Sequence, residues 1–290
     1  MNLPVGSSIN FEPIVFGGSD AKVVPDGVAN WTFFDGALMT LLVKTSAGTT
    51  AMGTVVAIAP GLAITATHIL GDHLNDIADG AGAVLCAAPS QHGLELWDVR
   101  KVNYTGSDDI AYLSLERASA IAEGWRLRTI PATTRAPNQG ERLHVIGFRL
   151  AKAHENDGSF GLKGDLFAAS GEVIAVYHPV RDKFMMPFPT IEIGCGALGG
   201  MSGGAVLDEQ GHLVGVVSTS LTTEDGGGPT FASWIVGGIN REVEITWPPG
   251  LYPNPVHILD IDERLLRLEG RERVRIIDSN SFEYEVWSDR

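Results

Sequence analysis

The feature that most constrains the fold of this chain is a series of short segments with the residue types of β-strands, each ending at turn residues. Turn signals occur at 59–61 (Ala-Pro-Gly), 156–158 (Asn-Asp-Gly) and 208–211 (Asp-Glu-Gln-Gly). Many short strands with few long helical patterns predict an all-β barrel or sandwich. Two weaker patterns, at 68–78 and 118–125, predict helices. The clearest strand segments are 38–43, 54–58, 62–66, 111–115, 143–146, 172–177, 190–193 and 213–218.

Composition narrows the classes of protein to which such a chain can belong. With 290 residues, of which 44% are apolar, the chain can bury a substantial core in one or two domains. It has no apolar run of about 18 residues or more, so no membrane span is expected. The formal net charge is −14, which would repel phosphate backbones, so nucleic acid is not an expected partner.

The cysteines and the first residues bear on the cellular compartment. The chain has two cysteines, Cys86 and Cys195, and secreted proteins stabilised by several disulfides need more. We therefore expect two free thiols. The first residues, Met1 to Gly6, lack the basic segment and apolar stretch of a secretory signal. Together these features predict a cytoplasmic protein.

Three polar residues occur in the order His68, Asp109 and Ser202, each in a context that suits nucleophilic catalysis. A serine hydroxyl is a poor nucleophile at neutral pH, so it needs a histidine to take its proton and a carboxylate to hold that histidine. It also needs backbone N–H groups to stabilise an oxyanion, and the glycine-rich run at 200–204 can turn such groups inward. The sequence shows no reliable metal-ligand spacing and no phosphate-binding loop, so no metal and no cofactor are expected.

These motifs resemble those of the trypsin-like, chymotrypsin-fold serine proteases. They are similar in particular to bacterial members of the Deg, or high-temperature-requirement, type. The likeness runs from about residue 30 to about residue 245. The segments that carry it are 53–58, 62–68, 108–113, 140–148, 200–205, 211–218 and 231–232.

The resemblance implies an all-β fold of two antiparallel six-stranded β-barrels with a C-terminal extension. It places an N-terminal segment at 1–29, the first barrel at 30–130 and the second barrel at 131–245. Residues 246–290 lie outside the resemblance and are richer in charged residues than the rest of the chain. This extension is either packed on the barrels or a docking element for a regulatory protein partner.

The resemblance also assigns a role to each residue of the trio. Ser202 would attack the scissile carbonyl, His68 would accept its proton and pass it to the leaving amine, and Asp109 would orient His68. We choose Asp109 over Asp108 because Asp109 directly precedes the Ile-Ala pair, and neighbouring strand residues face opposite ways. The backbone N–H groups of Gly200 and Ser202 would form the oxyanion hole.

Two positions differ from the digestive members of that family. Met201 stands where those enzymes carry the aspartate that pairs with a newly cleaved N-terminus, so no activation of that kind is expected. Gly196 stands where trypsin carries the aspartate that binds Arg or Lys. We therefore expect an uncharged pocket that prefers small or medium uncharged side chains. The residues expected at this substrate pocket are Gly196, Ser218, Ser220 and Thr230.

The resulting hypothesis is a regulated serine endopeptidase that acts on specific protein or peptide substrates. The glycine pair Gly199-Gly200 leaves open whether the oxyanion loop is rigid or is ordered by a partner or substrate. A barrel that kept the fold without the chemistry would instead be a protein-binding module. The spacing of Gly200, Ser202 and Gly204 also fits the nucleophile elbow of an α/β-hydrolase esterase, although a turn and a further strand follow where that fold needs a helix.

Overall fold

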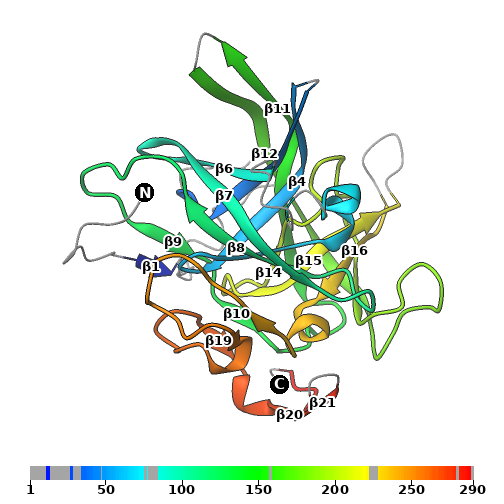
Figure 1. Ribbon diagram of the computed structural model, residues 1–290. Coiled ribbons are helices and arrows are strands. Elements are labelled where there is room, and N and C mark those ends of the chain that lie inside the picture. Colours follow the sequence, from blue (N-terminus) through cyan, green and yellow to red (C-terminus); the bar gives the residue numbers. More distant parts are fainter. Residues whose placement is uncertain are drawn as a thin grey trace.

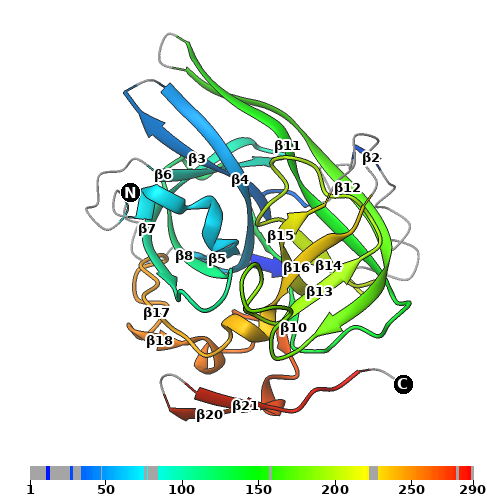
Figure 2. The same ribbon diagram turned by 90° about the vertical axis from the view of Figure 1, so that its right-hand side faces the viewer.

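The structure is a computed structural model that describes residues 11–13, 27–28, 34–46, 48–74, 77, 84–156, 159–221, 228–278 and 281–288. Two β-barrels dominate it and lie side by side (Figures 1 and 2). The prediction of an all-β fold with two antiparallel barrels is confirmed. None of the helical segments in the described ranges is long and apolar enough to cross a membrane.

The first barrel is closed by six strands in the order β3-β4-β5-β8-β7-β6, and Figure 2 shows the ring nearly end-on. Every neighbouring pair in it is antiparallel. The side chains that point inward are fully buried and include Met39, Leu41 and Leu113. The strands are β3 (Leu38–Thr45), β4 (Gly48–Ala59), β5 (Leu62–Thr65), β6 (Val84–Ser90), β7 (Gly93–Tyr104) and β8 (Ala111–Arg117).

The second barrel follows the order β14-β11-β12-β13-β16-β15, and a pairing of β14 with β15 closes it. Its neighbouring strands are also antiparallel. The hairpin of its two longest strands projects beyond the barrel, as Figure 1 shows at the top. The strands are β11 (Arg142–Asn156), β12 (Ser159–Tyr177), β13 (Thr190–Ile193), β14 (Ala205–Leu207), β15 (Leu213–Ser220) and β16 (Thr230–Trp234).

Shorter elements connect and cover the barrels. The short strand pairs are β1 (Phe11–Pro13) with β9 (Leu127–Thr129), β2 (Gly27–Val28) with β12, β10 (Ala132–Thr133) with β15 and with β19 (Leu268–Glu269), β17 (Glu242–Val243) with β18 (Val256–His257), and β20 (Val274–Asp278) with β21 (Ser281–Tyr284). The 3-10 helices are Thr67–Ile69, Gly71–His73, Ile235–Gly238, Ile258–Asp260 and Arg271–Arg273.

The two predicted helices have different outcomes. At 68–78 the chain forms two short 3-10 helices, Thr67–Ile69 and Gly71–His73, and Leu74 and Ile77 are also helical. The helix predicted at 118–125 is wrong, since these residues form bends and turns. The amides of Ala118 and Ser119 donate to the carbonyl of Leu96, at 2.9 and 3.2 Å, instead of to a helical partner. Tertiary pairing with β7 overrides the local pattern there.

The chain crosses back onto the first barrel after it has completed the second. Trp247 is 2% exposed and packs edge-on against Trp97, with ring centroids 5.1 Å apart, next to Trp125. Earlier in the same segment, the Arg241 guanidinium donates to the carbonyl of Ile110 at 3.0 Å and pairs with the Asp108 carboxylate. The segment after the second barrel therefore holds the two barrels together.

The last residues pack on the second barrel. Tyr284 of β21 lies edge-on to Trp234 and His178, with ring centroids 5.7 and 5.0 Å away. Trp287 donates from its indole N–H to Thr134 Oγ1 at 3.0 Å. The C-terminal extension thus packs on the barrels, and docking of a regulatory partner on it stays a prediction.

Candidate active site

His68 and Asp109 are brought together by the pairing of β5 with β8. Thr65, near the end of β5, pairs with Ala111 at the start of β8, so the residues just beyond each strand meet. His68 Nδ1 lies 2.8 Å from Asp109 Oδ2 and 3.1 Å from Oδ1. The backbone N–H of His68 donates to Asp109 Oδ1 at 2.9 Å. With Nδ1–H donating to the carboxylate, a neutral His68 presents Nε2 as a proton acceptor.

The Asp109 carboxylate is buried and has a second side-chain partner. Its residue is 8% exposed, whereas the side chain of the neighbouring His68 is 47% exposed. Ser218 Oγ donates to Asp109 Oδ2 at 2.5 Å. Because hydrogen bonds to a buried charge fix its position, this arrangement holds the carboxylate against His68 Nδ1.

Asp108 has a different set of partners from its neighbour. Its carboxylate pairs with the Arg241 guanidinium and accepts the amide of Ile110 at 2.9 Å. Both side chains of that ion pair are about 95% buried, at 4% and 5% exposure. The structure therefore places Asp109, and not Asp108, at His68, as the sequence predicted.

Ser202 lies on the turn before β14, half-buried. Its hydroxyl donates to the carbonyl of Ser218 at 3.5 Å, and its own carbonyl accepts the amide of Thr54 at 2.8 Å. Within the described residues, no hydrogen bond joins Ser202 Oγ to His68. Ser218 is thus the residue that bridges the two halves, because its hydroxyl binds Asp109 while its carbonyl faces Ser202.

The backbone around Ser202 leaves two amides available. Met201, Gly203 and Gly204 donate their N–H groups to the carbonyls of Leu198, Val217 and Met201. The N–H groups of Gly200 and Ser202 donate to no acceptor in the described part of the chain. These are the two amides predicted for an oxyanion hole. Gly200 has a φ of +95°, which favours glycine.

Three of the predicted substrate-pocket residues, Gly196, Ser220 and Thr230, lie close together, since Ser220 pairs with Thr230 and the Thr230 side chain binds both neighbours of Gly196. Thr230, fully buried, donates from Oγ1 to the carbonyl of Cys195 at 2.7 Å and accepts the amide of Ala197 at 2.8 Å. Gly196 is buried between those two positions, and Ser220 Oγ donates to the carbonyl of Pro229 at 3.3 Å. None of the four predicted residues carries a charge.

A cavity of about 480 Å³ opens beside His68. One side is formed by His68, Asp109, Ser218 and Thr219, and the other by a loop that sequence reasoning did not single out. That loop follows β12 and contributes the apolar side chains Met185, Met186, Pro187 and Phe188. Adjacent to them, Phe184 is 92% exposed. Apolar residues concentrated in an expected connection are the signal that could have found it.

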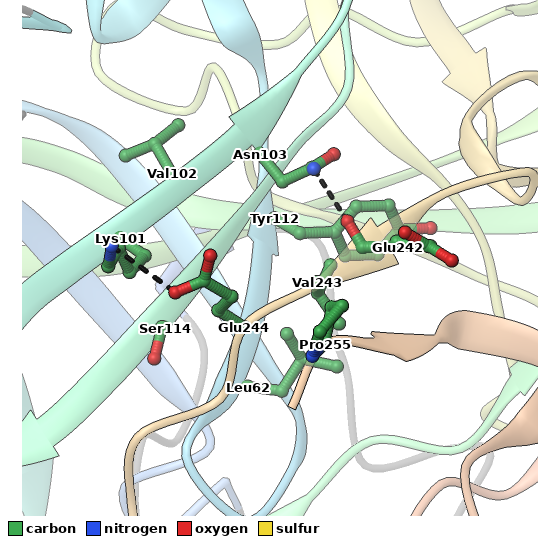
Figure 3. A pocket seen from close by; sticks show the side chains of 10 residues that line it. All are labelled: Leu62, Lys101, Val102, Asn103, Tyr112, Ser114, Glu242, Val243, Glu244 and Pro255. Carbon is green, nitrogen blue, oxygen red and sulfur yellow. Dashed lines mark hydrogen bonds and ion pairs between the residues drawn. The ribbon is translucent and has the colours of Figure 1, made fainter. Parts of the chain in front are cut away.

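A separate cavity of about 310 Å³ lies between β7, β8 and β17 (Figure 3). Lys101 and Glu244 form an ion pair of 3.2 Å at its edge, and Asn103 donates to the carbonyl of Glu242. None of His68, Asp109 and Ser202 lines it. Across the described residues, no group of three or more His, Cys, Asp or Glu side chains is placed to hold a metal ion.

The topology decides one of the predicted alternatives. An α/β-hydrolase needs a mainly parallel sheet with helices on its faces. The strand that follows Ser202, β14, pairs in an antiparallel manner with both of its neighbours. The esterase alternative is therefore wrong.

The chain is similar to a solved structure described as the Rv3671c protease in an inactive form, with 16% identity, a TM-score of 0.44, and coverage of 71% of this chain and 86% of that one. It is also similar to the HtrA-type protease AlgW solved with a decapeptide, with 15% identity, a TM-score of 0.49, and coverage of 77% of this chain and 66% of that one. No curated protein matches the sequence. The model of the trypsin-like peptidase domain matches residues 51–216, more than half of the chain, and the protein therefore belongs to that family.

Proposed function

We propose that the protein is a serine endopeptidase in which Ser202, His68 and Asp109 form a catalytic triad. The observation that carries the proposal is the hydrogen-bond network around the Asp109 carboxylate. Asp109 binds His68 Nδ1 on one side and the hydroxyl of Ser218 on the other, and the Ser218 carbonyl faces Ser202 Oγ. A histidine held in this way has the tautomer needed to take a proton from serine.

The reaction would proceed by acyl transfer. Ser202 Oγ attacks the carbonyl of the scissile peptide while His68 Nε2 takes its proton, and the resulting oxyanion accepts hydrogen bonds from the amides of Gly200 and Ser202. His68 then protonates the leaving amine, and water activated by the same residue hydrolyses the acyl-enzyme. The buried Asp109 carboxylate stabilises the imidazolium in both steps.

Attack requires Ser202 Oγ to leave the Ser218 carbonyl and approach His68. Rotation about χ1 would move Ser202 Oγ away from the Ser218 carbonyl, because the serine side chain is unbranched. Catalytic hydrogen bonds also often tighten only when substrate is bound. We propose that substrate binding selects the His68-facing rotamer. The same observation favours a second candidate, a catalytically silent protein-binding module in which Ser202 keeps its bond to Ser218.

The substrate would be a protein or peptide bound as an extended strand. The pairing of β15 with β14 ends at Val216, so one edge of β15 from Ser218 to Ser220 offers backbone groups for such pairing. The side chain at the cleaved bond would lie near Gly196. Because none of the four predicted pocket residues is charged, small or medium uncharged side chains are the preferred ones, and a peptide-library profile dominated by Arg or Lys would contradict this.

Covalent labelling by a fluorophosphonate tests the triad directly. We expect the wild-type protein to be labelled and to cleave casein. In Ser202→Ala, labelling should disappear and the rate of casein cleavage should fall roughly 10⁶-fold. A matched thermal unfolding midpoint in Ser202→Ala would show that the fold is intact. Labelling of the Ser202→Ala variant at the wild-type rate would place the nucleophile elsewhere. No labelling of the wild type would instead favour the binding module.

A further inference from the structure

Thr54 forms hydrogen bonds that reach beyond its own strand to the loop that carries Ser202 and to the second barrel. It lies in β4 of the first barrel and is fully buried. Its amide donates to the Ser202 carbonyl at 2.8 Å, and its hydroxyl donates to the Gly200 carbonyl at 3.2 Å. The hydroxyl also accepts the amide of Phe148, in β11 of the second barrel, at 2.8 Å. The Thr54 carbonyl in turn accepts the hydroxyl of Thr65 at 2.6 Å.

The strand around Thr54 is in direct contact with the loop that carries Ser202. A β-carbon on Gly53 would lie 2.7 Å from the Ser202 carbonyl oxygen, closer than real β-carbons approach. At Gly203, which has a φ of +78°, a β-carbon would overlap both Thr65 Oγ1 and the Thr54 carbonyl oxygen. The backbone of β4 therefore packs directly on the backbone of the loop that carries Ser202, with little room for either to move.

The two carbonyls that Thr54 holds belong to the same two residues, Gly200 and Ser202, whose amides are the candidates for the oxyanion hole. The Gly200 carbonyl belongs to the peptide that follows Gly200, so fixing its oxygen restrains one of the two backbone dihedral angles of that glycine. The Ser202 carbonyl fixes the peptide after the nucleophile. Glycine has the widest choice of backbone angles, so such a loop needs external bonds to hold one conformation.

We propose that Thr54 is a positioning residue that sets the backbone of the nucleophile loop, 200–204, from the opposite barrel. The effect of Thr54 on catalysis rests on the proposed function, whereas its effect on the backbone of the loop does not. The hydroxyl of Thr54 holds the Gly200 carbonyl, and through it the direction in which the loop presents its amides. Thr54 touches neither substrate nor reacting atoms in this role.

The chain offers well-matched variants to test this role. Thr54→Val removes the hydroxyl and keeps the shape, whereas Thr54→Ser keeps the hydroxyl. Thr40, the residue paired with Thr54 across β3 and β4, is equally buried, and its hydroxyl has no hydrogen-bond partner among the described residues. Thr40→Val is therefore a control that removes a buried hydroxyl from the same barrel without touching the loop.

Two measurements on the full chain are compared between these variants. The first is the rate of fluorophosphonate labelling, separated into its maximal rate and its half-saturating concentration. Thr54→Val removes the bonds of the hydroxyl to Gly200 and to Phe148, and of these only the bond to the Gly200 carbonyl acts on the loop. We expect its loss to lower the maximal rate roughly tenfold, with little change in half-saturation. Thr54→Ser should restore the rate and Thr40→Val should leave it unchanged.

The second measurement is amide hydrogen exchange over 198–204, which needs no activity. The amides of Met201, Gly203 and Gly204 are hydrogen-bonded and should be protected in the wild type. Exchange there should become several-fold faster in Thr54→Val alone, more than at amides of β6, which serves as the internal reference. A uniform rise over the whole chain would indicate general destabilisation and overturn the proposal.

The two measurements separate failure of this inference from failure of the proposed function. If the wild type is not labelled but exchange over 198–204 rises selectively in Thr54→Val, the proposed function fails and the positioning role stands. If the wild type is labelled and Thr54→Val matches Thr40→Val in both rate and exchange, Thr54 does not position the loop. If Thr54→Ser behaves like Thr54→Val, the hydroxyl is not the group responsible, and the proposal is also overturned.

Discussion

The two halves of the candidate site are held in different ways. His68 and Asp109 come from one barrel, and side-chain hydrogen bonds to a buried carboxylate fix them. Ser202 comes from a loop of glycines in the other barrel, where backbone groups make most of the contacts. The first half is therefore organised by charge and the second by close packing of backbone. Removal of the Asp109 charge should therefore abolish activity and leave the fold stable. A substitution that disturbs the close backbone packing around Ser202 should lower both activity and stability.

The largest expected effect tests the charged half. Asp109→Asn keeps the shape but removes the charge that selects the His68 tautomer, so we expect the rate of fluorophosphonate labelling to fall about 10⁴-fold. The neighbouring variant Asp108→Asn leaves the buried Arg241 without its ion pair, which should destabilise the fold by roughly 3–5 kcal/mol. Measured where both proteins are folded, labelling of Asp108→Asn should fall less than tenfold. Equal rates in the two variants would mean that Asp109 has no special role.

The next effect tests the backbone half. Gly203→Ala places a side chain where φ is +78° and where Thr65 Oγ1 and the Thr54 carbonyl already lie. We expect unfolding to become easier by more than the roughly 1–3 kcal/mol of backbone strain alone, with loss of labelling in the folded fraction. Gly140→Ala is the control, because Gly140 has a φ of +82° with no atom within 4 Å of an added β-carbon. Similar stabilities and rates in the two variants would contradict the close packing described for Gly203.

A smaller effect tests the residue that joins the halves. Ser218→Ala removes the hydroxyl that donates to Asp109, and hydrogen bonds to charged groups contribute about 1.5–3 kcal/mol. If that bond orients the carboxylate, labelling should slow by roughly tenfold to a hundredfold. Ser233→Ala removes another buried hydroxyl, from β16, that has no partner among the described residues. Slower labelling in both variants would assign the effect to packing in the second barrel.

The smallest effect concerns a charge that belongs to neither half. The hydrogen bond from His212 to Asp208 raises the pKa of His212, burial opposes the rise, and Glu269 adds to it. A histidine whose pKa is raised on folding stabilises the fold below its unfolded pKa, near 6.5, and loses that contribution as pH increases through the folded pKa. Thermal midpoints should show this loss in the wild type and a weaker one in His212→Gln. Labelling rates at one pH should not differ between the two proteins.

Much of the architecture could be predicted from local patterns. Short strand segments and turn residues predicted an all-β barrel or sandwich, and the family resemblance predicted two barrels. The motifs around His68 and Asp109 predicted a pair that the structure brings together, whereas Ser202 Oγ is bonded to the Ser218 carbonyl. Asp109 could be chosen over Asp108 because it directly precedes the Ile-Ala pair of the motif that carries the family resemblance. The helix expected at 118–125 failed because its amides pair with Leu96, a contact that no local pattern reports.

The missing parts of the site depend on contacts between residues far apart in the chain. Thr54 reaches Phe148 and Gly200, which are 94 and 146 positions away. Ser218 was expected at the substrate pocket, and the structure adds a bond from its hydroxyl to Asp109, 109 positions earlier. A buried threonine or serine in a strand looks the same in a sequence whether or not its hydroxyl has a partner, as Thr40 and Thr54 show.

The return of the chain onto the first barrel has a consequence for how the protein is made. Trp247 completes the aromatic cluster with Trp97, and Arg241 completes the turn that carries Asp109. During synthesis the first barrel leaves the ribosome long before either residue exists, and chains fold largely in the order in which they emerge. The nascent first barrel must therefore wait, with its aromatic cluster and its Asp109 turn unfinished, until the second barrel has followed it. A chain that ends before Arg241 would leave the turn that carries Asp109 without the bonds from Arg241 to Ile110 and Asp108, so His68 and Asp109 gain their full support only late in synthesis.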